Sequence, residues 1–154
     1  MNLQRRVLIL CTGNSARSQM AEGLLRSFGE DRFEVFSAGT KPSTVRPEAI
    51  AVMSELGIDL SGHRSNHVQE FDGQHFDYVV TVCDDANESC PVFPGDTERI
   101  HWSLPDPAAV EGSQTERLAA FRRVRDTLAE TLRDFINRIG PPTVTQDTSG
   151  CGRR

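Results

Sequence analysis

The sequence lacks long apolar runs and clusters of positive charge. No window in its 154 residues is apolar over the length that a membrane-spanning helix needs, and no apolar stretch follows a basic start and leads to a small-residue cleavage site. We therefore expect a cytoplasmic protein that makes no membrane contact. The formal net charge of −5 is spread over segments of mixed sign, and without a basic stripe to attract phosphates we expect no nucleic-acid partner.

Cysteines are few as well. Four of them would suggest two disulfides in a secreted domain, but without a secretion signal they indicate reactive thiols or a metal site. The length suits one domain that buries its core without disulfides or metals. We expect this domain over residues 1–140 and a polar, disordered tail over 141–154, in which Cys151 is an exposed and dispensable thiol.

What the sequence does contain is an alternation of short apolar runs with helical patterns. Strands that alternate with helices predict an α/β fold with a parallel sheet. We predict the elements in this order: a strand over 5–10, a helix from Ser15 to Gly29, a strand over 33–36, a helix from Pro47 to Gly57 with Ile50, Met53 and Leu56 on its apolar face, a strand over 77–82 near the sheet centre, and a weaker strand over 99–102.

The last predicted helix has the clearest pattern. Ser113 and Glu116 form a capping box, in which each side chain accepts a hydrogen bond from the other residue's backbone N–H. A long amphipathic helix is therefore predicted. Its apolar stripe consists of Leu118, Phe121, Val124, Leu128, Leu132, Phe135 and Ile139.

A cysteine and an arginine bound the loop between the first strand and the first helix. Cys11 ends the strand, and Arg17 follows after five intervening residues, at the start of the helix. Successive backbone N–H groups in such a loop can converge on a tetrahedral anion, the helix N-terminus adds its positive dipole end, and Arg17 can make a two-pronged contact. The same field favours a thiolate at Cys11, to which Ser18 could donate a hydrogen bond, and Gly13 permits close backbone approach.

Two other interpretations of this loop compete with the oxyanion cradle. Cys11 could be a buried structural thiol and Arg17 a solvated helix residue. A nucleotide-binding loop is the other, but the segment has neither the lysine of a Walker-type loop nor the spaced glycines of a dinucleotide fold. The coincidence of cysteine, glycine and arginine between a strand and a helix favours a cradle that brings an anion to the cysteine.

The segment from Cys11 to Arg17, with Ser18-Gln19-Met20-Ala21-Glu22 after it, resembles the signature loop of the low-molecular-weight protein tyrosine phosphatase fold, in its arsenate reductase branch. The similarity extends over about residues 7–135. It implies a three-layer α/β fold, with a four-stranded parallel sheet flanked by helices and the active loop at the carboxyl end of the first strand. It also implies that Cys11 attacks arsenate, with phosphate as a competitor, and that the oxyanion is bound by Thr12, Gly13, Asn14, Ser15, Ala16, Arg17 and Ser18.

Asp106 lies between two prolines, where an aspartate is most often a turn former. The resemblance implies a different role, because an Asp-Pro pair after the last strand supplies the general acid in similar enzymes. Ala108 stands where the phosphatase branch has an aromatic residue that helps to hold a phosphotyrosine ring, and the one tyrosine, Tyr78, falls within a predicted strand. A phosphotyrosine substrate is therefore disfavoured.

Cys83 and Cys90 are seven positions apart, directly after the strand predicted near the sheet centre. Three interpretations compete: a redox relay, two unrelated thiols, or a zinc site. A zinc site is disfavoured, because no Cys-x-x-Cys pair is present and His101 would be the one nearby nitrogen ligand. The resemblance and arsenic chemistry favour the relay, in which Cys83 attacks the arsenic-bearing Cys11, As(III) leaves, and Cys90 moves the disulfide outward. We expect 84–89 to be a short helix in the reduced protein that unwinds on oxidation.

The resemblance also bears on partners and metals. It implies thioredoxin as the reductant, and we expect a monomer that needs no cofactor. Glu22 and Ser37 resemble oxygen ligands of a potassium site found in some thioredoxin-linked members, but Asn66 stands where those members carry an acid. Because the loss of one negative charge weakens a hard-cation site, we assign no metal and give Asn14 a loop-shaping role.

Two alternative functions share part of this assignment. A low-molecular-weight phosphatase would use Cys11, Arg17 and Asp106 but would not need Cys83 and Cys90. A non-catalytic oxyanion-binding or redox-sensing module is the second alternative.

Overall fold

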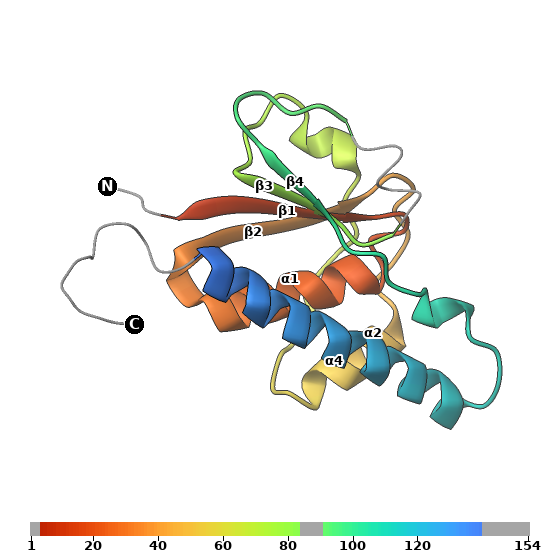
Figure 1. Cartoon of the computed structure of the whole chain (residues 1–154). Helices are drawn as coiled ribbons and strands as arrows, with labels where there is room; N and C mark the ends of the chain where they lie inside the picture. The colour runs from red at the N-terminus through yellow and green to blue at the C-terminus, as the bar shows by residue number, and fades with distance from the viewer. Residues whose placement is uncertain (1–3, 84–90, 140–154) are drawn as a thin grey trace, which may run out of the picture.

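A four-stranded parallel sheet forms the centre of the protein (Figure 1). The computed structural model describes residues 4–83 and 91–139. The strands lie in the order β2-β1-β3-β4, and each neighbouring pair is parallel. Their bounds are Arg5–Cys11 for β1, Phe33–Gly39 for β2, Tyr78–Thr81 for β3 and Glu98–His101 for β4. The predicted parallel α/β sheet is confirmed, and β3 occupies the interior position expected for it.

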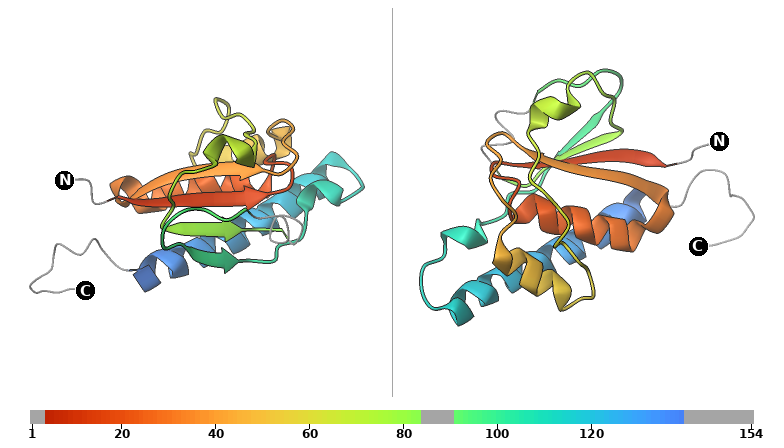
Figure 2. Two further views of the ribbon diagram at one scale, coloured as in Figure 1. Left: turned by 90° about the horizontal axis from the view of Figure 1, so that it is seen from above. Right: turned by 180° about the vertical axis from the view of Figure 1, so that it is seen from behind.

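In the described part of the chain, three α-helices lie on one face of the sheet (Figure 1), and the view from behind shows the same arrangement (Figure 2). The other face carries η2, a single 3-10 turn, within the described part of the chain. None of the helices in this part is both long and apolar enough to cross a membrane. The bounds are Arg17–Gly29 for α1, Pro47–Ser54 for α2 and Gln114–Ile139 for α4, with 3-10 turns at Glu30–Arg32 (η1), Val68–Phe71 (η2) and Pro107–Ala109 (η3).

The capping box of α4 forms as predicted. The Ser113 N–H donates to Glu116 Oε1 (3.0 Å), and the Glu116 N–H donates to Ser113 Oγ (3.1 Å). Most of the predicted apolar stripe is buried, and Phe135 packs its ring on Tyr78 of β3 with the centroids 5.2 Å apart. Tyr78 is therefore a core residue, and the C-terminal end of α4 packs against the sheet through Phe135.

An aromatic cluster covers part of the opposite face of the sheet. Phe76 lies at its centre, with ring centroids 5.8 Å from Phe36, 5.9 Å from Phe71 and 5.4 Å from Phe93. The Arg6 guanidinium stacks over two of these rings, 4.7 Å from the centroid of Phe76. Because Phe93 is buried in this cluster, the chain is anchored there before it enters β4.

Helix α2 is shorter than predicted. It ends at Ser54, and Leu56, which we expected on the apolar face, is 47% exposed. The N–H groups of Leu56 and Gly57 bond to carbonyls three residues back, and Gly57 then takes a φ of +76°. The glycine provides the left-handed turn expected of it, but the helix has already tightened into a 3-10 pattern.

The residue after α2, Glu55, ties this end of the helix to α4. It accepts hydrogen bonds from Arg122 Nη2 and Arg125 Nη1, both at 2.7 Å. The hydrogen bonds from Arg122, and then those from Arg125, lower the pKa of the Glu55 carboxyl from 4.5 to about 2. A carboxyl with a lowered folded-state pKa contributes stability above its unfolded pKa, and loses that contribution as the pH falls from about 4.5 toward 2.

We predict that Glu55→Gln lowers the free energy of unfolding at pH 7, and that the difference from the parent protein narrows as the pH is lowered through 4 to 3. Solvent screens the partly exposed carboxylate, so the effect should be modest. Glu130→Gln, at an exposed position of α4, is the control for the loss of one charge. Denaturant unfolding of the three proteins at each pH measures this. A difference that stays constant between pH 7 and 3 would contradict the ion-pair account.

Candidate active site

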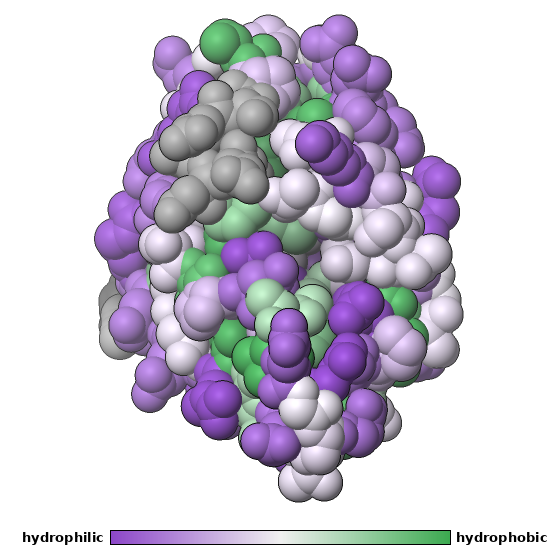
Figure 3. Space-filling model, turned by 90° about the vertical axis from the view of Figure 1, so that its right-hand side faces the viewer, coloured by the Kyte–Doolittle hydropathy of each residue, from purple (hydrophilic) through white to green (hydrophobic). Residues whose placement is uncertain are grey.

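The candidate nucleophile lies at the carboxyl end of β1. Cys11 is the last residue of that strand, α1 begins at Arg17, and the six residues from Cys11 to Ala16 carry the chain from one element to the other. The Cys11 side chain is buried, with 2% of the residue exposed. Figure 3 faces this end of the sheet, where hydrophobic atoms show between polar side chains.

The carbonyl groups of the loop point outward. Thr12 O accepts from the N–H of Lys41 (2.9 Å), Gly13 O from that of Ser43 (3.0 Å) and Ser15 O from that of Arg46 (2.8 Å). In a trans peptide the carbonyl and the next N–H point in opposite directions, and the described part of the chain contains no cis peptide. The N–H groups of Gly13, Asn14 and Ala16 are thus turned toward the inside of the loop. Consistent with this, the Asn14 N–H donates to Cys11 Sγ at 3.2 Å.

Asn14 fixes this loop conformation. Its φ is +48°, a left-handed conformation that asparagine tolerates better than most residues. Its carbonyl accepts from Ser65 Oγ (2.7 Å) and from Gln19 Nε2 (3.1 Å). Its side-chain Oδ1 accepts from the backbone N–H of Asn66 at 2.8 Å, and since that N–H can only donate, it determines which side-chain atom is the oxygen.

The Asn14 amide nitrogen sets the direction of the hydrogen bonds beneath Cys11. Asn14 Nδ2 donates to Ser18 Oγ (2.7 Å) and to Ser37 Oγ (3.0 Å), and Ser37 in turn donates to the buried carboxylate of Glu22 (2.5 Å). Ser18 therefore accepts from Asn14 and keeps its own proton for Cys11 Sγ, 2.8 Å away. A donated hydrogen bond of this kind stabilises a thiolate.

The residues that resemble a potassium site all lie in this network. The amide nitrogen of Asn66 donates to the Ser37 carbonyl at 3.2 Å, and Glu22 is paired with Arg26 at 2.8 Å through its second oxygen. Both oxygens of Glu22 thus already face donors, so the arrangement does not offer a free carboxylate to a cation.

Arg17 and Asp106 meet at the opening of the loop. Arg17 Nη1 donates to the Leu104 carbonyl at 3.0 Å, and Arg17 Nη2 lies 3.9 Å from Asp106 Oδ2. Asp106 Oδ1 accepts from the Ala108 N–H at 3.0 Å and so caps η3. The aspartate is therefore a turn former through one oxygen, while the other faces the arginine. Its side chain is 46% exposed, which leaves it open to solvent and to a bound anion.

Cys83 lies beside the same loop. It follows β3 and is buried, and its Sγ lies 3.3 Å from the hydroxyl oxygen of Thr12, the residue bonded to Cys11. Cys90 and the predicted short helix over 84–89 lie outside the described residues. His101, weighed above as a zinc ligand, has its Nδ1 2.7 Å from Thr81 Oγ1. No group of three or more potential metal-binding side chains occurs within the described ranges.

The sequence interpretation missed Gly39, the last residue of β2. A Cβ built on it would overlap the carbonyl oxygen of Thr12 and crowd the N–H of Asn14. Gln19 was missed as well. It is fully buried, its Nε2 donates to both oxygens of Asn14, and its Oε1 accepts from His63 Nδ1 at 3.0 Å. The small residues Ser37-Ala38-Gly39 at the end of β2 were the available signal for a close backbone approach.

Comparison with known proteins identifies the family. The low molecular weight phosphotyrosine protein phosphatase family matches residues 6–144. The arsenate reductase of Halalkalibacterium halodurans is 43% identical over 129 residues, which are 84% of this chain and 93% of that protein. The arsenate reductase of Bacillus subtilis is 41% identical over the same length and the same shares of both chains.

Solved structures agree with the sequence comparisons. An arsenate reductase in the oxidized state has a TM-score of 0.75 and 33% identity, covering 89% of this chain and 100% of its own. An arsenate reductase in the phosphate binding state has a TM-score of 0.72, at the same identity and coverage. A tyrosine phosphatase from Erwinia amylovora, at 20% identity over 88% of this chain and 93% of its own, shares the fold with a TM-score of 0.69. The resemblance drawn from the loop sequence is confirmed, and the chain belongs to the low molecular weight phosphotyrosine protein phosphatase family.

Proposed function

We propose that this enzyme reduces arsenate to arsenite, with Cys11 as nucleophile and Cys83 as the second thiol. The observation that carries the proposal is that two buried thiols flank Thr12 at one oxyanion loop. A phosphatase needs one such thiol, whereas a reductase that oxidises its own cysteines needs two. The curated relatives are arsenate reductases, and solved arsenate reductases that share 33–34% sequence identity with this chain are described in oxidized and reduced states.

The first step is an attack on arsenic. The inward N–H groups and the Arg17 guanidinium would hold the oxyanion, and the Cys11 thiolate would form an arsenic–sulfur bond. One arsenate oxygen must leave in exchange. Asp106, which lies 3.9 Å from Arg17, would give that oxygen a proton so that it leaves as water.

The second step is the reduction itself. The Cys83 thiolate would attack Cys11 Sγ, so that a sulfur–sulfur bond forms and the arsenic–sulfur bond breaks. The electron pair of the broken bond stays on arsenic, which leaves as As(III). Two cysteine sulfurs are oxidised to a disulfide in the same step. Phosphate cannot follow this path, because thiols do not reduce phosphorus, so it should bind the loop as a competitor.

The third step restores Cys11. Cys90 would attack Cys83, releasing the Cys11 thiolate and leaving a Cys83–Cys90 disulfide for an external reductant. We propose thioredoxin as that reductant and the cytoplasm as the compartment, with the enzyme acting as a monomer.

A second candidate is slow hydrolysis of simple phosphate esters. It is favoured by one observation, the presence of Cys11, Arg17 and Asp106 in one site, which is all that a cysteine phosphatase of this family requires. Phosphotyrosine itself is a poor candidate, because Tyr78 is packed in the core and Ala108 offers no ring for stacking. The two activities share a nucleophile but differ in their need for a second thiol.

We predict that Cys11→Ser abolishes arsenite production and ester hydrolysis together, whereas Cys83→Ser or Cys90→Ser stops multiple-turnover reduction and spares ester hydrolysis. The measurement is arsenite release with thioredoxin, its reductase and NADPH, set beside hydrolysis of para-nitrophenyl phosphate by the same preparations. Equal loss of both activities in Cys83→Ser would return that thiol to a structural role. Turnover retained by Cys11→Ser would refute the assignment of Cys11 as the nucleophile.

We predict that Asp106→Asn slows arsenic–sulfur bond formation about a hundred- to ten-thousand-fold, the usual contribution of a positioned general acid. Asparagine can still accept the Ala108 N–H and cap η3, so the turn is retained while the proton is lost. Phosphate inhibition constants should stay near those of the parent protein. Single-turnover arsenite formation measures the chemical step, and an unchanged rate would leave Asp106 with the capping role alone.

We predict that Gly39→Ala weakens phosphate and arsenate binding and slows both activities, because the added methyl group pushes on the loop carbonyl and N–H described above. Gly62→Ala is the matched control, since a Cβ there meets nothing within 4 Å. Phosphate inhibition constants for both variants provide the test. If the two variants behave alike, the loop does not depend on close contact with the end of β2.

A further inference from the structure

The Gln19 side chain lies behind the Cys11–Ala16 loop and is fully buried. Its Nε2 faces three acceptors: the Asn14 carbonyl (3.1 Å), Asn14 Oδ1 (3.1 Å) and the Arg64 carbonyl (3.0 Å). Oxygens of this kind can only accept, so the Gln19 atom that faces them must be the amide nitrogen. The orientation of this buried amide therefore follows from its surroundings.

His63 supplies the donor for the other end of the amide. Its Nδ1 lies 3.0 Å from Gln19 Oε1. Because an amide oxygen cannot donate, His63 Nδ1 must carry a proton whether the ring is neutral or charged. The backbone of the histidine is itself anchored, since the His63 N–H donates to the carbonyl of the fully buried Leu60 at 3.0 Å. The ring is thus held where it can complete the hydrogen bonds of Gln19.

A lost donor at His63 cannot be replaced by a turn of the Gln19 amide. Turning the amide over would place Oε1 against the three acceptors described above. Leaving it in place would bury an acceptor without a donor, which costs more free energy than the hydrogen bond had contributed. Either outcome weakens the contact between Gln19 and Asn14. That contact matters because the Asn14 N–H donates to Cys11 Sγ.

We propose that His63 is a positioning residue for Cys11 and acts through Gln19 and Asn14. The inference deepens the proposed function, because it rests on Cys11 as the nucleophile. Hydrogen bonds are donated in sequence from His63 Nδ1 to Gln19, from Gln19 Nε2 to Asn14, from Asn14 Nδ2 to Ser18, and from Ser18 Oγ to Cys11 Sγ. A partly exposed histidine outside the loop thereby helps to determine where the donors around the thiol point.

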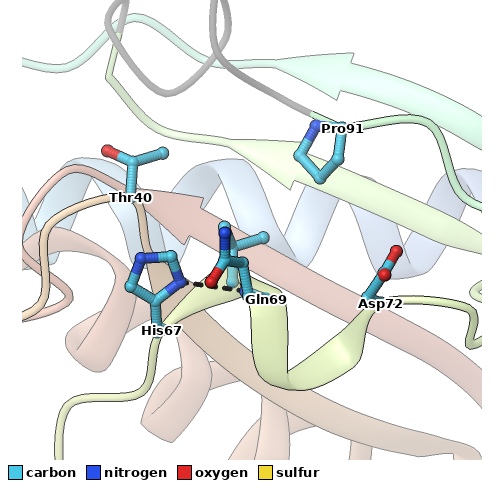
Figure 4. A pocket seen from close by; sticks show the side chains of 6 residues that line it. Thr40, His67, Gln69, Asp72 and Pro91 are labelled. Atoms are coloured by element: carbon cyan, nitrogen blue, oxygen red, sulfur yellow. Dashed lines mark hydrogen bonds between the residues drawn. The ribbon is translucent and has the colours of Figure 1, made fainter.

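His67, four positions later, has the opposite hydrogen-bond pattern. Its ring lines a hollow of about 270 Å³ beside η2 (Figure 4), and its Nδ1 accepts from the Gln69 N–H at 3.0 Å. A backbone N–H can only donate, so His67 Nδ1 carries no proton and the proton of the neutral ring lies on Nε2. The two histidines are therefore held in different tautomers, and of the two it is His63 that contacts Gln19.

Long-range proton–nitrogen NMR spectra of the imidazole rings test these tautomers, at a pH where both rings are neutral. The variants His63→Asn and His67→Leu assign the two sets of signals. We expect the proton on Nδ1 in His63 and on Nε2 in His67. A proton on Nε2 in neutral His63 would overturn the proposal. Because the spectra need no turnover, this result is independent of whether arsenate is reduced.

Phosphate binding and ester hydrolysis test the effect on the loop. His63→Leu fills the space of the ring without a donor. His63→Asn retains a donor, since asparagine Nδ2 is as many bonds from Cα as histidine Nδ1. His67→Leu is the matched control, because it removes a partly exposed ring and one hydrogen bond outside this network. The measurements are the Kd of phosphate by titration calorimetry and kcat for para-nitrophenyl phosphate, on reduced full-length proteins.

We expect His63→Leu to raise the Kd of phosphate and to lower kcat, each about threefold to tenfold, which is the effect of one hydrogen bond. His63→Asn should restore both values, and His67→Leu should match the parent protein. Parent-like values in His63→Leu would overturn the proposal. So would a His63→Asn variant as impaired as His63→Leu, or an equal impairment in His67→Leu, because the effect would then not depend on the Nδ1 donor.

Discussion

The site depends on one constraint, the direction in which the peptide groups of the Cys11–Ala16 loop point. Neighbouring segments bind the loop carbonyls from outside, and the planar trans peptide then turns the N–H groups toward Cys11. Asn14 adopts the left-handed conformation that makes this backbone path possible. Its side-chain amide also donates a hydrogen bond to Ser18, so that the Ser18 hydroxyl donates to Cys11. The donors are therefore in place before an anion arrives, which is the arrangement that stabilises developing charge most effectively.

The elements with a local signal could be predicted from the sequence. The Ser113–Glu116 box, the apolar stripe of α4 and the run that forms β1 depend on neighbouring residues, and all of them form as predicted. The end of α2 was predicted too late in the chain: the turn before Gly57 closes with 3-10 hydrogen bonds, and Glu55 in that turn is paired with arginines of α4 that are distant in sequence. Helical spacing contains no information about such a partner.

The cradle could be predicted only in part, for the same reason. Cys11 and Arg17 belong to one short segment, so their spacing alone predicted an oxyanion loop. The supports of that loop come from elsewhere: Gly39 from the end of β2, and Ser65 and Asn66 from a segment some fifty residues away. Their roles follow from backbone contacts that no periodicity or motif encodes.

In the proposed mechanism two thiols, Cys11 and Cys83, supply the electrons for reduction. The most direct measurement uses Cys90→Ser with one equivalent of arsenate and no external reductant. We expect one arsenite per protein and, by peptide mapping under acid quench, one Cys11–Cys83 disulfide formed at the same rate. Arsenite released without that disulfide, or a disulfide joining either thiol to a different cysteine, would contradict the two-thiol mechanism.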